Sequence, residues 1–461
     1  MRRGGRPLTR VRIHRDKFGF DISVIRLRGR HAGHGRNLLI HPGNPGDSGM
    51  GFMYKHGGHL STIIGEGHHI VSFDTRGLNS SWPQVKCFQE DKGRKKSLDL
   101  WYKYIKSKED ARVLWQKARR FVKACETNMG QHGKYTNSLQ IAADMEAIRK
   151  GLGQDTLNFW GLSYGGVLGH TYSVLFPDRV GRVILDGSLH PKEWFGFSAF
   201  GELGYRVTKC FESFIHRCHS NRARCPFEPL PDDDKALRAE ALSFVEKIKT
   251  LKTPTVRLNS THHGLIGRLD VWTKGIIPAL GSPLKWHDLA NRLASLMRGD
   301  PEEAFLAYGT YHEPPFNGPE MNDYYDLVVL NDAADGEWNS EEWNDDYRMS
   351  NIITSSFLDF HPTALIEFER FLQVTRWRNT LTNPVMWEDQ PEEKPGNPIL
   401  FISTGEPCVG GDPVFRRDGN EWLAIQDRAG HTSISMPSKC VALAIREFLD
   451  GRPPTSQGAF E

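Results

Sequence analysis

A serine between two glycines is the first feature of this chain that could do chemistry. Gly-Leu-Ser-Tyr-Gly at residues 161–165 follows a short apolar run and leads into a helix-like stretch at residues 167–176. A strand that turns sharply into a helix lifts the side chain of the turning residue clear of the sheet. The free N–H groups at the start of the helix favour negative charge developing beside them. The pattern predicts Ser163 as a nucleophile, with glycines where the turn leaves no room for a Cβ.

A histidine near the end of the chain has the place of a general base. A serine hydroxyl is a weak nucleophile until a base accepts its proton during the attack. His431 lies in a loop between a predicted strand at residues 421–426 and a closing helix at residues 438–449. We predict His431 as the base; the alternative is an ordinary histidine of a surface loop.

The carboxylate that would orient this histidine is open between two residues. It should come from the loop after a predicted strand at residues 398–403. Glu406 stands just past the end of that strand and is the first choice, and Asp412, farther along the loop, is the second. Either one would hold the imidazole in the tautomer that accepts the proton.

Two backbone N–H groups are needed to stabilise the oxyanion of an acyl transfer. One should belong to Tyr164, directly after the nucleophile, and the other to the loop after an early strand. The glycine- and proline-rich residues 41–49 fit that loop, because glycines let the backbone approach a ligand and prolines stiffen the turn. We assign the second donor to Asn44, with Gly43 next. A plain connecting turn is the other interpretation.

Strands and helices alternate around these residues. Further strands are predicted from apolar runs and helices from apolar residues at helical spacing: strands at residues 11–14, 21–27, 37–40, 69–74 and 180–186, and helices at residues 50–64 and 138–152. The alternation predicts an α/β fold with a mostly parallel sheet and helices on both faces. Catalytic loops should then lie at the carboxyl ends of the strands.

The pattern changes between about residues 189 and 396. Amphipathic helical stretches, predicted at residues 237–251, 287–297 and 362–374, replace the alternation before strands resume. A sheet that is interrupted and then completed predicts a core at residues 1–188 and 397–461 with an inserted helical lid at residues 189–396. Its acidic run, from Asp332 to Asp346, could bind a substrate ammonium group or form a solvated lid loop.

Composition narrows the class of partner. The 59 basic residues nearly balance the 56 acidic ones, and a formal net charge of +3 gives no reason to expect nucleic acid or a membrane as partner. No apolar stretch approaches the roughly 18–20 residues that cross a bilayer. The basic N-terminus has no apolar segment behind it, so a cytoplasmic location is expected, with secretion open if the N-terminus is incomplete.

The seven cysteines contain no Cys-x-x-Cys pair. Cys210, Cys218 and Cys225 lie near His216 and His219 in the sequence, but the spacing of these cysteines is loose for a structural zinc site. Disulfides or buried thiols are the better interpretation. Neither a metal nor a cofactor is predicted.

Together these segments resemble the tripeptidyl-aminopeptidase-like branch of the α/β-hydrolases, relatives of the prolyl aminopeptidases. His-Pro-Gly-Asn-Pro-Gly-Asp-Ser-Gly at residues 41–49 is similar to the family's Asn-Pro-Gly-Gly-Pro-Gly-Gly-Ser-Gly. Phe-Asp-Thr-Arg-Gly at residues 73–77 is similar to its Phe-Asp-Pro-Arg-Gly. The densest likeness runs from residue 143 to residue 180, and residues 185–187 and 429–440 also match. The inserted region matches more faintly.

The resemblance implies an α/β-hydrolase fold, a tripeptidyl aminopeptidase-like C-terminal part, and a serine exopeptidase that acts on free N-termini without a metal. Two departures stand out. Asn44 and Asp47 replace two glycines of the family's loop. The family's acid lies in an Asp-Pro-Val-Thr-Pro-like segment, for which Glu406-Pro407 or Asp412-Pro413-Val414 must stand here.

Three classes of function therefore remain. The first is a serine hydrolase that acts through an acyl-enzyme on Ser163 and cleaves peptide or amide bonds as an exopeptidase. The second is an esterase, thioesterase or lactonase acting on a small molecule such as a secondary metabolite. The third is a relative that binds a ligand without catalysis. The expected substrate is a small peptide or a small-molecule ester or amide.

Overall fold

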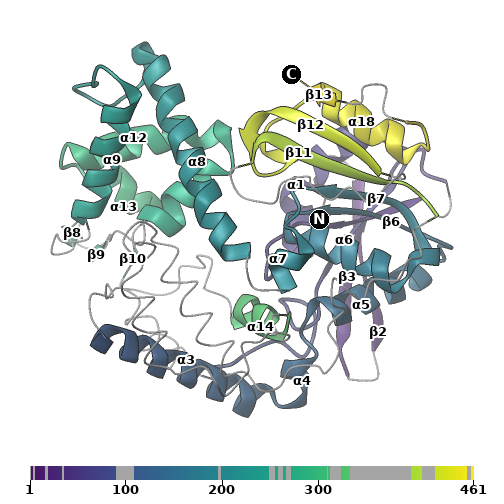
Figure 1. Cartoon of the computed structure of the whole chain (residues 1–461). Helices are drawn as coiled ribbons and strands as arrows, with labels where there is room; N and C mark the ends of the chain where they lie inside the picture. Colours follow the sequence, from purple (N-terminus) through teal and green to yellow (C-terminus); the bar gives the residue numbers. More distant parts are fainter. Residues whose placement is uncertain are drawn as a thin grey trace.

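Figure 1 shows the fold as a computed structural model of the chain. The described residues are 2–3, 6–15, 19–33, 36–89, 108–195, 199–248, 255–257, 263–265, 271–308, 310–311, 323–332, 396–407, 421–453 and 458–460.

Ten strands of the described segments form one sheet. Their order across the sheet is β1 (Arg2–Arg3), β2 (Arg6–Arg15), β3 (Asp21–Leu27), β5 (His69–Asp74), β4 (Asn37–His41), β6 (Leu157–Leu162), β7 (Val180–Asp186), β11 (Ile399–Pro407), β12 (Glu421–Gly430) and β13 (Gly458–Phe460). Neighbours from β5 to β13 run parallel, whereas β1, β2, β3 and β5 pair antiparallel. The prediction of a mostly parallel sheet is confirmed.

Helices cover both faces of this sheet, which explains why its central strands carry apolar side chains on both faces. On one face, α1 (Gly49–Ile64) and α18 (Lys439–Leu449) pack against side chains such as Trp160. On the other, α5 (Ser138–Gly151) and α6 (Tyr164–Leu175) pack against side chains such as Phe159. Successive residues of β6 thus serve opposite cores, because side chains alternate along a strand.

The last two long strands extend farther than the sequence indicated. β11 and β12 continue their parallel pairing as far as Pro407 and Gly430, with an irregularity in register between Thr404 and Glu406. We expected Glu406 just past the end of its strand. It lies instead within β11, opposite Ala429. The sequence predicted that these strands end where the apolar run ends. In the structure they are longer, because backbone hydrogen bonds between β11 and β12 continue beyond that run.

Helices of the region between β7 and β11 form a separate cluster to the left of the sheet in Figure 1. The elements are α8 (Ala199–Ser220), α9 (Asp234–Ile248), the π-helix η3 (Val271–Ile276), α11 (Ile277–Leu280), α12 (Trp286–Met297) and α13 (Glu302–Tyr308), with short helical turns η2 (Arg222–Arg224) and η4 (Pro283–Lys285). The short helix α7 (Pro191–Phe195) instead joins the core through Trp194. A small antiparallel sheet joins β8 (Thr255–Arg257), β9 (His263–Leu265) and β10 (Thr310–Tyr311).

The first two helices expected here correspond to α9 and α12, while the one expected at residues 362–374 lies outside the described residues. Apolar side chains such as Phe211, Phe214 and Leu289 fill the interior of the helical cluster. None of the helices that the structure describes has the length and apolar character of a membrane span.

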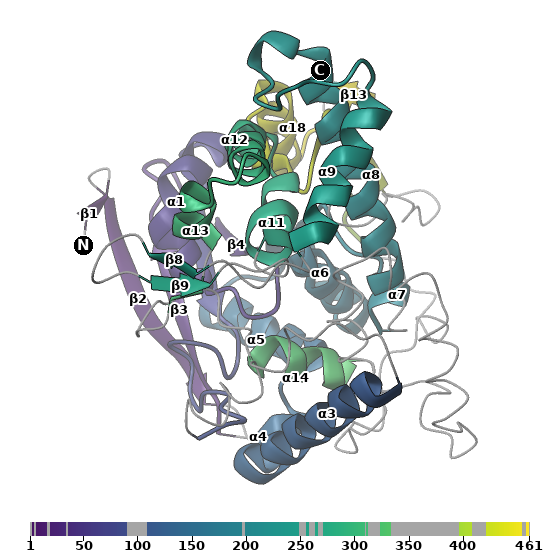
Figure 2. The same cartoon turned by 90° about the vertical axis from the view of Figure 1, so that its left-hand side faces the viewer.

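A second helix of this region also packs on the core. α14 (Asp323–Asp332) lies between α3 (Lys108–Met129) and α5 in both views (Figures 1 and 2). Its Tyr324 joins the core cluster and donates a hydrogen bond of 2.6 Å to the Thr75 hydroxyl. Asn331 donates to the carbonyl oxygens of two residues around the short α4 (Gln131–Lys134). A segment expected to belong to a lid thus completes the core.

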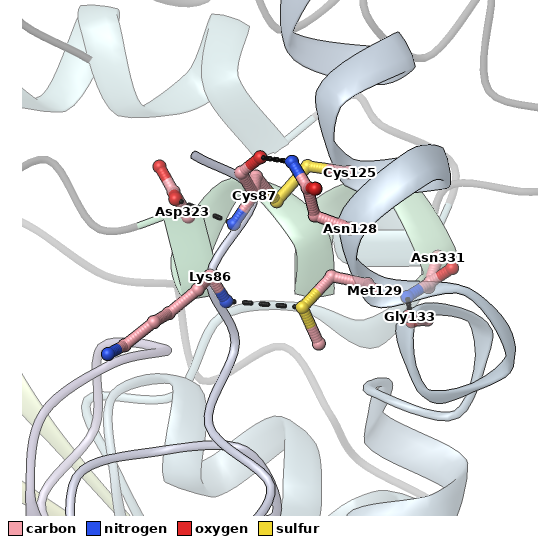
Figure 3. The surroundings of a disulfide bond; sticks show 8 residues. All are labelled: Lys86, Cys87, Cys125, Asn128, Met129, Gly133, Asp323 and Asn331. Atoms are coloured by element: carbon pink, nitrogen blue, oxygen red, sulfur yellow. Dashed lines mark hydrogen bonds between the residues drawn. A yellow bond between two sulfur atoms is a disulfide. The ribbon is translucent and has the colours of Figure 1, made fainter. Parts of the chain in front are cut away.

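A disulfide fixes the loop that follows β5 to α3 (Figure 3). Cys87 and Cys125 are bonded, Asn128 donates to the Cys87 carbonyl oxygen at 2.7 Å, and the Cys87 N–H donates to Asp323 at 3.0 Å. The same loop is therefore tied to α3 by a covalent bond and to α14 by a hydrogen bond.

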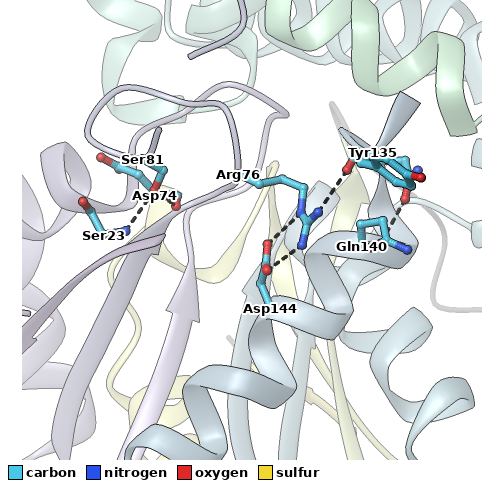
Figure 4. A network of polar contacts seen from close by, with 8 residues as sticks. Ser23, Asp74, Arg76, Ser81, Tyr135, Gln140 and Asp144 are labelled. Atoms are coloured by element: carbon cyan, nitrogen blue, oxygen red, sulfur yellow. Dashed lines mark hydrogen bonds and ion pairs between the residues drawn. The ribbon is translucent and has the colours of Figure 1, made fainter. Parts of the chain in front are cut away.

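A buried ion pair fixes the beginning of that loop to α5 (Figure 4). Two nitrogens of Arg76 donate to the carboxylate of Asp144 at 2.6 and 2.9 Å, and the two side chains are only 1% and 2% exposed. Such paired N–H···O bonds fix direction as well as distance. The Phe-Asp-Thr-Arg-Gly motif thereby has a structural explanation.

Candidate active site

Ser163 occupies the turn between β6 and α6, with β6 ending at Leu162 and α6 beginning at Tyr164. Its backbone has φ 54° and ψ −121°, in the left-handed region that a residue with a Cβ rarely adopts. The Ser163 N–H donates to the carbonyl oxygen of Asp186 at 2.8 Å, and its own carbonyl accepts from Gly166 at 2.8 Å. Neighbouring backbone therefore holds the strained conformation, as a nucleophile elbow requires.

The two glycines of the motif are required by space. A Cβ at Gly161 would lie 2.1 Å from the Gly165 carbonyl oxygen, and one at Gly165 would lie 2.9 Å from the His41 carbonyl oxygen. Both distances are shorter than atoms tolerate. The glycines allow β6, α6 and the loop after β4 to meet around the serine.

The loop after β4 lies directly against the nucleophile. A Cβ at Gly43, where φ is 99°, would stand 2.9 Å from the Ser163 Cβ. The Gly43 N–H donates to Nδ1 of buried His41 at 3.2 Å, so it is already engaged. The backbone N–H groups of Asn44 and Tyr164 donate to no other described residue. This arrangement favours Asn44 over Gly43 as the second oxyanion donor.

His41 must be neutral to accept that hydrogen bond on Nδ1. Burial lowers the pKa of His41 to about 3, so the ring stays uncharged at neutral pH. Sequence reasoning gave His41 no role. Its place in the motif corresponds to the family's asparagine, another residue with an acceptor at short reach, and that correspondence was the available signal.

The far end of the loop is fixed to the end of β5. The Ser48 hydroxyl donates to Asp74 at 2.6 Å and accepts from the Gly51 N–H at 2.9 Å, which caps α1. The Met50 N–H donates to the same carboxylate at 3.1 Å. Both ends of the candidate oxyanion loop are therefore anchored.

His431 begins the loop after β12, at the same end of the sheet as Ser163. The His431 carbonyl oxygen lies against Gly187, where an added Cβ would stand 2.1 Å from it. Gly187 directly follows Asp186, whose carbonyl oxygen accepts from the Ser163 N–H. From the helical region, the Gly281 carbonyl oxygen accepts from the His431 N–H at 3.1 Å. The structure thus brings both backbones to one place, although no hydrogen bond joins these two described side chains.

The electrostatics of His431 suit a base that lacks one partner. Although the residue is partly exposed, its Nδ1 is enclosed and has no hydrogen-bond partner among the described residues. Burial lowers the pKa of His431 to about 4, so the ring is neutral at pH 7, as a general base must be. A carboxylate at Nδ1 would complete a triad of serine, histidine and acid.

The acid remains a prediction. Glu406 lies in β11 opposite Ala429, two residues before His431. Asp412 lies outside the described residues.

Asp186 is a carboxylate at this site that sequence reasoning did not assign. It ends β7 and is fully buried, and it accepts hydrogen bonds from the Ser433 N–H and hydroxyl and from the Trp160 indole. Burial raises the pKa of Asp186 to about 6. A polar residue at the end of an apolar strand was the available signal, but its partner lies 247 residues away.

Asp332, the first residue of the acidic run, is neither a solvated lid residue nor free to bind a substrate ammonium group. It is buried and accepts from the Ser138 N–H at 2.8 Å, from the Ser138 hydroxyl at 2.5 Å and from the Trp194 indole at 2.8 Å. The Ser138 hydroxyl also lies 2.6 Å from the Tyr164 hydroxyl. The rest of the acidic run lies outside the described residues.

Cysteine sulfurs near the two histidines are used in disulfides. Cys218 is bonded to Cys225, and Cys210 is disulfide-bonded as well. Among the described residues, no cluster of three or more histidine, cysteine or acidic side chains could hold a metal ion.

Comparison with known proteins agrees with this geometry. Residues 36–206, from β4 through the elbow to the start of α8, match the family described as alpha/beta hydrolase fold. The chain has the α/β-hydrolase fold. The oxyanion loop and the elbow both fall inside the matched residues, and the strands after the helical region complete the same sheet.

Curated relatives confirm the resemblance to the peptidase branch. Serine protease Hip1 of Mycobacterium tuberculosis is 29% identical over 283 residues, which cover 57% of this chain and 50% of that protein. Tripeptidyl aminopeptidase of Streptomyces lividans is 31% identical over 172 residues, 34% of this chain and 30% of that protein. The matches thus span half of the length of the first relative and less of the second.

A third relative is named for a different activity. Carboxylesterase B of Mycobacterium tuberculosis is 25% identical over 450 residues, which cover 91% of this chain and 79% of that protein.

Proposed function

We propose that the protein is a serine hydrolase that works through an acyl-enzyme on Ser163 and acts as an exopeptidase on free N-termini. The observation that carries the proposal is the left-handed backbone of Ser163 between β6 and α6, with Gly43 packed against it. Strain of this kind persists where surrounding contacts hold it, and it presents the hydroxyl at the edge of the sheet.

In the proposed reaction, the Ser163 Oγ forms a bond to the scissile carbonyl carbon while its proton passes to Nε2 of His431. The N–H groups of Tyr164 and Asn44 stabilise the oxyanion. Collapse of the tetrahedral intermediate breaks the C–N bond, and His431 returns the proton to the leaving amine. Water, activated by His431, then attacks the acyl-enzyme in the same way and releases the acyl group from Ser163 as a carboxylic acid.

The choice of a peptide substrate is supported by the relatives. Hip1 is named a serine protease and the Streptomyces relative a tripeptidyl aminopeptidase. Because this chain spans only part of each, the substrate belongs to the proposal. Serine hydrolases of one fold act on many bonds, so the substrate must be tested directly.

Two measurements test the proposal. A fluorophosphonate should label the full chain with one equivalent at Ser163, and Ser163→Ala should not react. His431→Ala should lower turnover by about 10⁴-fold or more, because triad members act as a unit. A wild-type chain that stays unlabelled would refute the hydrolase.

The substrate class is tested by a matched pair of compounds. Aminoacyl arylamides with a free amino group should be turned over, and their N-acetylated forms should be poor substrates, because an exopeptidase must bind the ammonium group. Equal rates for the two forms would contradict the exopeptidase.

A small-molecule esterase, thioesterase or lactonase is the second candidate, favoured by the similarity to carboxylesterase B over most of this chain. It would use the same serine and histidine. Short-chain aryl esters turned over well, with no cleavage of any aminoacyl arylamide, would decide for it.

We further propose that residues 189–396 cover the site as an inserted lid on a core of residues 1–188 and 397–461. The hydrogen bond from His431 to Gly281 supports contact between lid and site. Within that range, α14 packs on the core. Limited proteolysis should cut within the lid first.

An oxidising compartment is also proposed, in contrast to the cytoplasmic location expected from sequence. Cys87–Cys125 and Cys218–Cys225 are disulfides, which form and persist mainly in oxidising environments. Alkylation of the native protein before and after reduction tests this. All four thiols reacting without reductant would contradict it.

A further inference from the structure

The loop that begins with His431 is held to the core by one buried carboxylate. This base loop comprises residues 431–435. The Ser433 N–H donates to one oxygen of Asp186 at 2.8 Å, and the Ser433 hydroxyl donates to the other at 2.5 Å. Because Asp186 is fully buried, these bonds to a carboxylate are shielded from water and direct the loop strongly.

The same residue also holds the nucleophile. The backbone carbonyl of Asp186 accepts from the Ser163 N–H at 2.8 Å, and the next residue, Gly187, lies against the His431 carbonyl oxygen. Asp186 thus touches the elbow with its main chain and the base loop with its side chain.

Asp186 does not have the geometry of the acid that orients the histidine. Its two oxygens accept from Ser433 and from the Trp160 indole, the latter at 3.1 Å. The Nδ1 of His431 has no partner among the described residues. The carboxylate therefore acts on the loop and not on the imidazole.

We propose that Asp186 is a positioning residue that sets the distance between Ser163 and His431, by binding the elbow through its carbonyl and the base loop through Ser433. This inference rests on the proposed function, because positioning has meaning only if the two side chains react together. Misplacing a reacting group by about 1 Å costs on the order of 100-fold in rate.

The test compares two alanine variants in the same loop. Ser433→Ala removes the hydroxyl that binds Asp186. Ser435→Ala removes a hydroxyl that donates only to the Thr432 carbonyl, at 2.6 Å, within the loop. On the substrate that the wild type turns over best, Ser433→Ala should lower kcat about 10- to 100-fold with KM nearly unchanged. Ser435→Ala should stay within about threefold of the wild type.

Two further variants separate positioning from damage to the fold. Ser433→Thr keeps the hydroxyl and should recover most of kcat. Asp186→Asn should reproduce the loss. An amide has one acceptor oxygen, whereas the donors of Ser433 and Trp160 now use both carboxylate oxygens. Thermal melting of each variant identifies any that fail to fold.

The outcomes are distinct. Equal kcat in Ser433→Ala and Ser435→Ala would overturn the inference, as would a loss in Ser433→Ala that Ser433→Thr does not recover at an unchanged melting temperature. If the wild type is not labelled at Ser163, the proposed function fails and the inference fails with it. A labelled wild type with an unaffected Ser433→Ala overturns only the role of Asp186.

Discussion

Removing the carboxylate that orients His431 should lower the apparent pKa of the acid limb of kcat/KM. In the free enzyme that limb reports protonation of the base. Burial alone lowers the pKa of His431 from 6.5 to about 4. A carboxylate at the enclosed Nδ1 would stabilise the imidazolium and raise the pKa by about 1–3 units.

The magnitude follows from these two effects. With the acid present, the limb should lie about 1–3 units above the value that burial sets; without it, the limb should return to about 4. The rate should fall as well, because an unoriented imidazole adopts the wrong tautomer, and this costs kcat about 10⁴-fold in a serine triad.

The assay is a pH profile of kcat/KM for Glu406→Gln and Asp412→Asn, on the best substrate of the wild type. Only the variant of the true acid should show both the shift and the loss of rate. Asp178→Asn is the matched control. Asp178 is exposed and lies just before the start of β7, whereas Ser163 follows the end of β6, so the two lie at opposite ends of these parallel strands.

Two results would refute the reasoning. If neither variant moves the acid limb or the rate, the acid is neither Glu406 nor Asp412. If the variant of the acid loses rate while its acid limb rises, a carboxylate does not stabilise the imidazolium here.

Three other changes have definite expected outcomes. Asp144→Ala leaves the Arg76 guanidinium buried without its carboxylate and should cost about 3–5 kcal/mol of unfolding free energy in urea; a loss below about 1 kcal/mol would mean that the site relaxes. Gly43→Ala places a Cβ 2.6 Å from the Leu162 carbonyl oxygen, and fluorophosphonate labelling should slow at least about tenfold; unchanged labelling would contradict the loop's role. Burial raises the pKa of Asp332 from 3.8 to about 6, so the folded state binds more protons between these values and its stability declines as pH rises through about 6. Asp332→Asn, which does not titrate, should therefore cost more at about pH 4 than at about pH 8; the reverse order in melting temperatures would show the pKa to be lowered.

The sequence anticipated the elements that depend on local pattern. β7 is observed at the predicted residues, and α1 and α5 begin or end within one residue of expectation. Amphipathic periodicity and punctuation by glycine are local signals. The turn at Ser163 belongs with them, because a strand, a small flexible residue and a helix start lie within a few positions.

Elements were misplaced where distant partners decide. Glu406 lies inside β11 because the backbone pairs with β12 beyond the apolar run. The helix α14 belongs to the core because its side chains meet Thr75 and the segment around α4. Neither partner could be identified from a window of sequence, since the residues in contact are separated by long stretches of chain.

The sequence by itself determined the type of fold, the serine and the glycines that its turn demands, because each follows from the conformational limits of a few consecutive residues. Only the tertiary structure decided that Gly43 gives its N–H to His41 and that Asp186 binds both the elbow and the base loop. Those decisions depend on which buried donors and acceptors meet, because most buried polar groups bind a partner that only the folded chain supplies.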